Sequence, residues 1–293
     1  MSRRPVRSRL RSLAALAGAT ALAAASLVGT AAPASADPTW APASSATIKP
    51  GVQMYTAGGQ CTGNFVFTDN AENVYVGYSA HCAGTGGATA TDGCTSGSLP
   101  LGTRVDFVRG GNLLFPGTTV GRGTLVYSSW LAMQQAGTTD TNACAYNDFA
   151  LVRVDDADKG KVNPSIPFFG GPTGVNTTGT SVGAQVYSYG NSSLRAGIEL
   201  LSPKTGISLG TTGNGWSHPV YTLTPGVPGD SGSAFVDAQG RALGTLSTLA
   251  LAPLPASNGV GDFSREFGFA QQRSGIAGLR LVEGTEPFRA PLG

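Results

Sequence analysis

The stretch Thr224-Pro-Gly-Val-Pro-Gly-Asp-Ser-Gly-Ser-Ala-Phe235 decides how the rest of the chain is interpreted. It places Ser231 in a turn between Gly229 and Gly232, where the backbone can bend sharply and another group can approach its N–H donors. A serine hydroxyl is a weak nucleophile unless a base takes its proton and donors stabilise the oxyanion that forms. A nucleophilic Ser231 therefore requires a base and an orienting acid elsewhere in the chain.

Two histidines are available as the base. His81 ends an apolar segment in Tyr78-Ser-Ala-His-Cys82, and Asp148 precedes a strand-like segment in Tyr146-Asn-Asp-Phe-Ala-Leu-Val152. The order His, Asp, Ser is one of three unrelated orders in which this triad occurs. The second histidine, His218, lies at the edge of an expected strand, and we interpret it as structural.

Taken together, Ser-Ala-His-Cys, Asp-Phe-Ala-Leu-Val and Gly-Asp-Ser-Gly resemble the motifs of chymotrypsin-type serine peptidases, in particular the bacterial secreted branch. The resemblance extends from about residue 47 to residue 282. It implies an all-β fold of two antiparallel six-stranded Greek-key barrels, with the active site in the cleft between them and a C-terminal helix. His81 and Asp148 would then lie on the first barrel and Ser231 on the second.

The resemblance also implies a role for each residue. Ser231 would attack the scissile carbonyl, His81 would act as general base and then general acid, and Asp148 would orient the imidazole. The N–H groups of Gly229 and Ser231 would form the oxyanion hole. Two alternatives remain open: a catalytically silent relative that binds a partner in the same cleft, and an esterase that uses the same triad.

The sequence departs from the family around the nucleophile. It lacks an Ile-Val-Gly-Gly amino terminus to pair with Asp230, so an internal arginine is expected to take that place, and Arg195 is the candidate. Ser233 stands where the family has a second glycine after the serine. The added side chain in this tight turn predicts a lower activity.

The specificity pocket is mapped by the same resemblance. Its base would be Pro225, and its wall would be Ser247, Thr248 and Leu249. These residues carry no charge, which favours cleavage after small or apolar side chains. Two acidic residues downstream, Asp262 and Glu266, remain candidates for a counter-charge in the pocket.

The four cysteines are Cys61, Cys82, Cys94 and Cys144. An even number in an exported chain indicates two disulfides, for which three pairings exist. A zinc site is the competing interpretation, but the sequence has no CxxC pair. The resemblance implies a bridge from Cys61 to Cys82 around the histidine loop, which leaves Cys94 and Cys144 for the second. We expect no metal and no cofactor.

Residues 1–36 have the pattern of a signal peptide for the general secretory route. Five arginines precede an Ala/Leu-rich stretch, and Ala34-Ser-Ala36 gives a small-residue cleavage site. Without these arginines the chain has 14 basic and 17 acidic residues, a formal net charge of −3 in place of +2. The expected product is a secreted monomer whose partner is a protein or peptide substrate, with neither a nucleic acid nor a membrane as partner.

The remaining sequence suits short strands separated by turns. Residues 37–155 are expected to form the N-terminal barrel, 156–175 a linker, and 176–293 the C-terminal barrel. Within the second barrel, one strand is expected at Gly197–Leu200, and the closing helix at Gln271–Leu281.

Overall fold

The strands of this protein form two antiparallel arrangements, an eight-stranded sheet and a closed six-stranded barrel. The computed structural model describes residues 38–87, 90–250 and 257–291. All of them belong to a single unit that runs from Ser35 to Gly293. The expected signal peptide lies outside the described residues.

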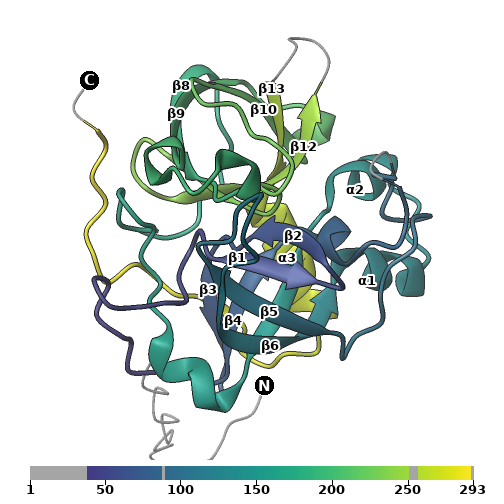
Figure 1. Cartoon of the computed structure of the whole chain (residues 1–293). Helices are drawn as coiled ribbons and strands as arrows, with labels where there is room; N and C mark the ends of the chain where they lie inside the picture. Colours follow the sequence, from purple (N-terminus) through teal and green to yellow (C-terminus); the bar gives the residue numbers. More distant parts are fainter. Residues whose placement is uncertain (1–37, 88–89, 251–256, 292–293) are drawn as a thin grey trace, which may run out of the picture. The chain divides into compact units, whose positions relative to one another are not determined.

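The first sheet has the strand order β14-β3-β4-β7-β6-β5-β1-β2. Its strands are β1 (Gln53–Thr56), β2 (Gly59–Thr62), β3 (Val66–Thr68), β4 (Val74–Tyr78), β5 (Arg104–Arg109), β6 (Thr118–Ser128), β7 (Ala150–Val154) and β14 (Arg280–Leu281). Figure 1 labels six of these strands, β1 to β6. The resemblance implied six strands here. The eight found include β14, which the C-terminal end of the chain adds next to β3.

The second arrangement closes as expected. Its order is β10-β13-β12-β11-β8-β9. The strands are β8 (Val182–Tyr189), β9 (Pro203–Leu209), β10 (Ser217–Thr222), β11 (Ala234–Asp237), β12 (Ala242–Ala250) and β13 (Ser257–Asp262). The strand expected at Gly197–Leu200 is wrong: two short 3-10 turns, η3 (Ser193–Arg195) and η4 (Glu199–Leu201), occupy that region, and β9 begins after them.

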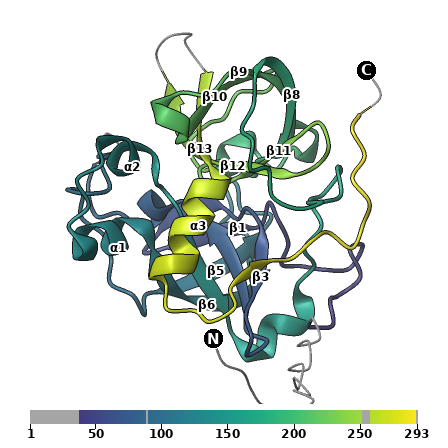
Figure 2. The same ribbon diagram turned by 180° about the vertical axis from the view of Figure 1, so that it is seen from behind.

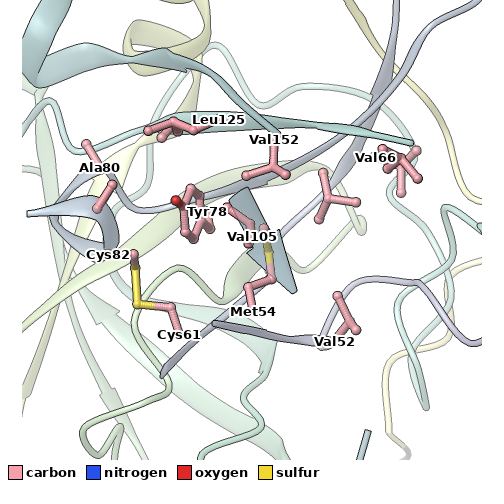
Figure 3. Packing of buried hydrophobic residues seen from close by; sticks show 14 of the residues in the cluster. Val52, Met54, Cys61, Val66, Tyr78, Ala80, Cys82, Val105, Leu125 and Val152 are labelled. Atoms are coloured by element: carbon pink, nitrogen blue, oxygen red, sulfur yellow. A yellow bond between two sulfur atoms is a disulfide. The ribbon is translucent and has the colours of Figure 1, made fainter. Parts of the chain in front are cut away.

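Alternating burial fixes which face of the first sheet is inside. In β5, Val105 and Phe107 are fully buried, while Arg104 is exposed and Asp106 half-buried, as the two-residue period of a strand requires. Figure 3 shows the resulting cluster, in which Met54 and Val105 lie near Tyr78. The disulfide between Cys61 and Cys82 lies in the same cluster.

Two short helices connect β6 to β7, and the sequence interpretation did not foresee them. Helix α1 (Ser129–Ala136) ends at Gly137, whose φ of 62° is readily adopted by glycine. Helix α2 (Thr141–Tyr146) begins at Asp140, whose carboxylate accepts hydrogen bonds from two N–H groups of its first turn. The second disulfide joins Cys94 to Cys144 in α2.

Helix α3 (Phe263–Arg273) begins eight residues before the expected position of the closing helix, which corrects that prediction. Asp262 caps it by accepting the Arg265 N–H at 2.9 Å. Its buried Phe263 and Phe267 lie in one core cluster with residues of both strand arrangements, among them Phe67, Tyr187 and Val236. Figure 2 shows the start of α3 near β12 and β13 and the rest of the helix over the first sheet. The helix therefore joins the two halves.

Residues 156–175, the expected linker, run from η2 (Asp156–Lys161) to an isolated bridge between Val175 and Ala242. The exact domain boundaries stay a prediction. Within the described ranges, no helix is long and apolar enough to cross a membrane.

Candidate active site

Strand pairing brings His81 and Asp148 together. Strand β4 pairs with β7, with Tyr78 opposite Ala150. The segment that leaves β4 and the segment that enters β7 therefore lie next to each other at the same end of the two strands. His81 follows β4 in the short turn η1 (Ala80–Ala83), where the bridge from Cys82 holds the neighbouring residue.

The buried Asp148 carboxylate accepts three hydrogen bonds. Its Oδ2 lies 2.6 Å from His81 Nδ1, and its Oδ1 accepts the main-chain N–H of His81 at 2.8 Å. The hydroxyl of Ser247, a residue of β12, donates to Oδ2 at 2.5 Å. Asp148 thus fixes both the backbone and the ring of His81, and a residue from the second barrel completes its hydrogen bonding.

The two charges alter each other's proton affinity. Burial works to lower the pKa of His81, but the charge of Asp148 and its hydrogen bond outweigh burial, so the pKa of His81 is raised above its ordinary value. Burial works to raise the pKa of Asp148, and the charge and hydrogen bonds of His81 together with the Ser247 hydroxyl reverse this and lower it. Asp148 is therefore ionised near neutral pH.

Ser231 faces the same cavity as His81, a space of about 540 Å³. The Ser231 carbonyl accepts the Thr62 N–H at 2.8 Å, and the next residue, Gly232, donates its N–H to Leu246 at 2.7 Å. A Cβ on Gly232 would lie 2.4 Å from the Thr62 carbonyl, so this position requires glycine. Among the described residues, no hydrogen bond joins Ser231 Oγ to His81 Nε2, and in free enzymes such catalytic hydrogen bonds are often long or poorly aligned.

The two expected oxyanion donors are oriented through their peptide planes. The Pro228 carbonyl accepts the Ser192 hydroxyl, and the Asp230 carbonyl accepts both the N–H and the hydroxyl of Ser233. The C=O and N–H of a trans peptide point in opposite directions. The N–H groups of Gly229 and Ser231 therefore point away from these contacts, and neither has an acceptor within the described part of the chain. Ser233 supports this turn, a role that the sequence did not suggest.

Asp230 is fully buried beneath the turn and meets two cations. Arg195 forms an ion pair with its carboxylate, and Lys204 Nζ lies 3.0 Å from Oδ2. The N–H groups of Ser192 and Val227 donate to the same carboxylate at 3.0 and 3.1 Å. Arg195 was the expected partner of Asp230. Lys204 was missed, because a lysine inside β9 carries no sequence signal for burial.

The residues expected to form the specificity pocket are only partly brought together. The cavity next to Ser231 is lined by Ser247 and Thr248 but not by Pro225, whose carbonyl accepts from Arg195 at 2.9 Å. Leu249 pairs through its backbone with Asn258, and its side chain lies outside the described part of the structure. The pocket-side lining consists of Gly226, Val227, Pro228, Leu246, Ser247, Thr248 and Asn258.

Two groups of His, Cys and Asp side chains lie close enough together to suggest a metal site. One contains His81 with Cys61 and Cys82, and the other contains Asp92 with Cys94 and Cys144. In both groups the two cysteines form a disulfide. A disulfide has no thiolate, which is the form of cysteine that binds metals. Neither group therefore has the donors of a metal site.

No family model and no curated protein matches the sequence. The backbone is similar to solved structures of bacterial proteases. Protease A of Thermobifida fusca matches with a TM-score of 0.49 and 16% identity, over 81% of this chain and 99% of that one. A Nocardiopsis protease matches with a TM-score of 0.46 and 16% identity, over 80% of this chain and 98% of that one. A Cellulomonas bogoriensis chymotrypsin matches with a TM-score of 0.44 and 17% identity, over 80% of this chain and 98% of that one. Values this low do not establish shared chemistry, so the side-chain geometry has to carry the functional assignment.

Proposed function

We propose that this protein is a serine endopeptidase that acts through Ser231, His81 and Asp148 by way of an acyl-enzyme. The observation that supports this most directly is the double contact of Asp148 with His81. It holds Nδ1 as the protonated nitrogen and leaves Nε2 free to accept a proton in the cavity that Ser231 lines. A buried structural aspartate would not need to orient an imidazole at a cavity.

The proposed chemistry follows from this arrangement. His81 Nε2 takes the Ser231 proton as Oγ bonds to the substrate carbonyl carbon, and the carbonyl electrons move to the oxygen. The N–H groups of Gly229 and Ser231 stabilise that oxyanion, and loss of one such donor typically costs about 3 kcal/mol. His81 then gives the proton to the departing amine. Water repeats the steps and releases the acyl group.

The lining of the cavity favours a neutral side chain before the cleaved bond. Of the described residues that line the cavity, the one carboxylate is Asp148, which His81 already engages. An unpaired Lys or Arg side chain of a substrate would lose several kcal/mol of hydration there. The two disulfides favour an oxidising compartment, and with the expected signal peptide they support secretion.

Labelling by a fluorophosphonate probe tests the proposal. The wild-type protein should be labelled and Ser231→Ala should not, while the exposed Ser44→Ala serves as the matched control and should be labelled fully. Labelling without cleavage of casein or a peptide library, but with cleavage of simple esters, would favour an esterase. No labelling of the folded wild-type protein would favour a silent relative and refute the proposal.

A further inference from the structure

Glu266 is a buried acidic side chain that the proposed mechanism does not use. It lies in the first turn of α3, on the face that also buries Phe263, Phe267 and Ala270, and its exposed fraction is 0%. Burying a carboxylate among aromatic rings is costly unless the group is paired or keeps its proton. Its position therefore needs a physical explanation.

The carboxyl group is aimed at the main chain of Asp148. Glu266 Oε1 accepts the Asp148 N–H at 3.1 Å. Gly261 makes room for this contact, because a Cβ there would lie 2.2 Å from Oε1. The hydrogen bond spans 118 residues of sequence and connects the C-terminal helix to the segment that enters β7.

The surroundings of Glu266 contain negative and neutral groups. From the other elements, the titratable groups that face it are Asp148 before β7 and Tyr127 on β6, and Asp262 caps its own helix. The two aspartates are already paired with His81 and with His218. Helix α1 contributes no charged residue.

The cations of α3 turn elsewhere. Arg265 lies over the Trp216 ring and Arg273 over the Phe269 ring. Within the described ranges, no cation forms an ion pair with Glu266, and its Oε2 has no hydrogen-bond partner from the protein. Burial, reinforced by the charges of Asp148 and Asp262, raises the pKa of Glu266 well above its ordinary value, and this outweighs the lowering effects of the Asp148 N–H and the Thr245 side chain.

We propose that Glu266 is a positioning residue of the active site: a neutral carboxylic acid that holds the main chain of Asp148 in place from the C-terminal helix. The proposal rests on the proposed function for its catalytic meaning, but not for the charge state of Glu266. Asp148 is then held at two points, its carboxylate by His81 and Ser247 and its backbone by Glu266.

The charge state can be tested without any activity, by comparing the wild type with Glu266→Gln in urea unfolding from pH 5 to pH 8. A free glutamate ionises near pH 4.3, so in this range the unfolded wild-type chain releases the proton that the folded chain keeps. The wild type should therefore lose stability relative to the variant as the pH rises. The ratio of their unfolding constants should grow about tenfold per pH unit until the pH reaches the raised pKa.

A surface control separates this effect from a general effect of charge. Glu283 is exposed, and Glu283→Gln should give a ratio that is nearly independent of pH. A flat ratio for Glu266→Gln as well, or one that falls with pH, would mean that Glu266 is ionised in the folded protein and would overturn the proposal. An infrared C=O band of a protonated carboxyl group that is present in the wild type and absent from Glu266→Gln would support it.

The positioning role is tested by kinetics. Glu266→Gln keeps a neutral acceptor and should retain kcat to within about twofold, whereas Glu266→Ala should lower kcat more than it raises KM. In Glu266→Ala the acid limb of kcat/KM should also move to lower pH, because a displaced Asp148 raises the pKa of His81 less. Equal loss of kcat in both variants, or an unchanged pH profile in Glu266→Ala, would refute the role.

The outcomes remain separable from the proposed function. If Glu266→Ala does not fold, the Gln variant still carries both the stability and the kinetic comparison. If the wild type neither cleaves peptides nor reacts with the probe, the proposed function fails, while the unfolding ratio still decides whether Glu266 is neutral.

Discussion

The cluster around Asp230 gives a prediction about stability that does not depend on activity. Asp230 and Lys204 are both fully buried and Arg195 is 8% exposed, so a single carboxylate faces two cations without solvent. Burial has the largest effect on the pKa of Lys204 and lowers it. The charge of Asp230 opposes this lowering, and the charge of Arg195 adds to it. Burying the Lys204 cation therefore costs free energy, whereas both cations depend on the Asp230 carboxylate.

The magnitudes separate two substitutions. Asp230→Asn leaves two buried cations with no counter-charge, and breaking a buried pair in this way costs about 3–5 kcal/mol of the free energy of unfolding. Lys204→Met removes the extra cation and keeps an unbranched side chain of similar length. The carboxylate still has Arg195 and the N–H groups of Ser192 and Val227. We therefore expect Lys204→Met to change the free energy by no more than about 1 kcal/mol, in either direction.

Urea unfolding at pH 7, followed by far-ultraviolet circular dichroism, measures both values from the midpoint and slope. Lys159→Met, which removes a surface partner of Asp156, serves as the control and should leave the midpoint unchanged. The reasoning is refuted if Lys204→Met destabilises the protein as much as Asp230→Asn does. That result would mean that the carboxylate needs both cations.

Three further predictions concern activity. His81→Ala and Ser231→Ala should each abolish nearly all peptide hydrolysis, and the double variant should be hardly worse, because the two residues share one proton transfer; additive losses would contradict this. Ser233→Ala removes one of the two donors to the Asp230 carbonyl. It should lower kcat about fivefold at unchanged KM, because one hydrogen bond contributes about 1 kcal/mol. A change confined to KM would argue against a role of Ser233 in the oxyanion hole. The kcat/KM of the wild type should fall as the pH drops through the raised pKa of His81, because the base must be neutral. Asp148→Asn should move this acid limb to lower pH and should lower kcat by up to about four orders of magnitude. A pH profile of Asp148→Asn that matches the wild type would exclude His81 as the titrating base.

Short motifs allowed much of this molecule to be predicted. The segments around His81, Asp148 and Ser231 each combine a strand with a turn, and such local patterns can be read from a few neighbouring residues. The strand-like segment that follows Asp148 is confirmed as β7 (Ala150–Val154). The C-terminal helix was misplaced because its residues include Gly268 and several polar side chains. The signal that could have located it is the cap Asp262 followed by an apolar pattern at helical spacing.

Buried charges were the part that the sequence could not supply. Lys204 lies 26 residues from Asp230 and Glu266 lies 118 residues from Asp148, and nothing in either neighbourhood marks the side chain as internal. Glu266 was considered for the specificity pocket, yet it contacts the opposite end of Asp148, the main-chain N–H. Such pairings arise only in the packed structure, because burial of a charge depends on tertiary contacts rather than on local pattern.

The C-terminal strand determines when this protein can finish folding. In β14, Arg280 and Leu281 pair with Thr68 and Phe67 of β3, more than 200 residues earlier in the chain. Contacts so distant in sequence form late, since a long loop must close before they contribute. A ribosome adds about 5–20 residues per second, so the early strands wait many seconds for their last neighbour. While the chain is still being synthesised, the first sheet lacks its edge strand β14 and Asp148 lacks its anchor on α3. We therefore expect the geometry around Asp148 to become complete only after α3 has been synthesised and has packed against the first sheet.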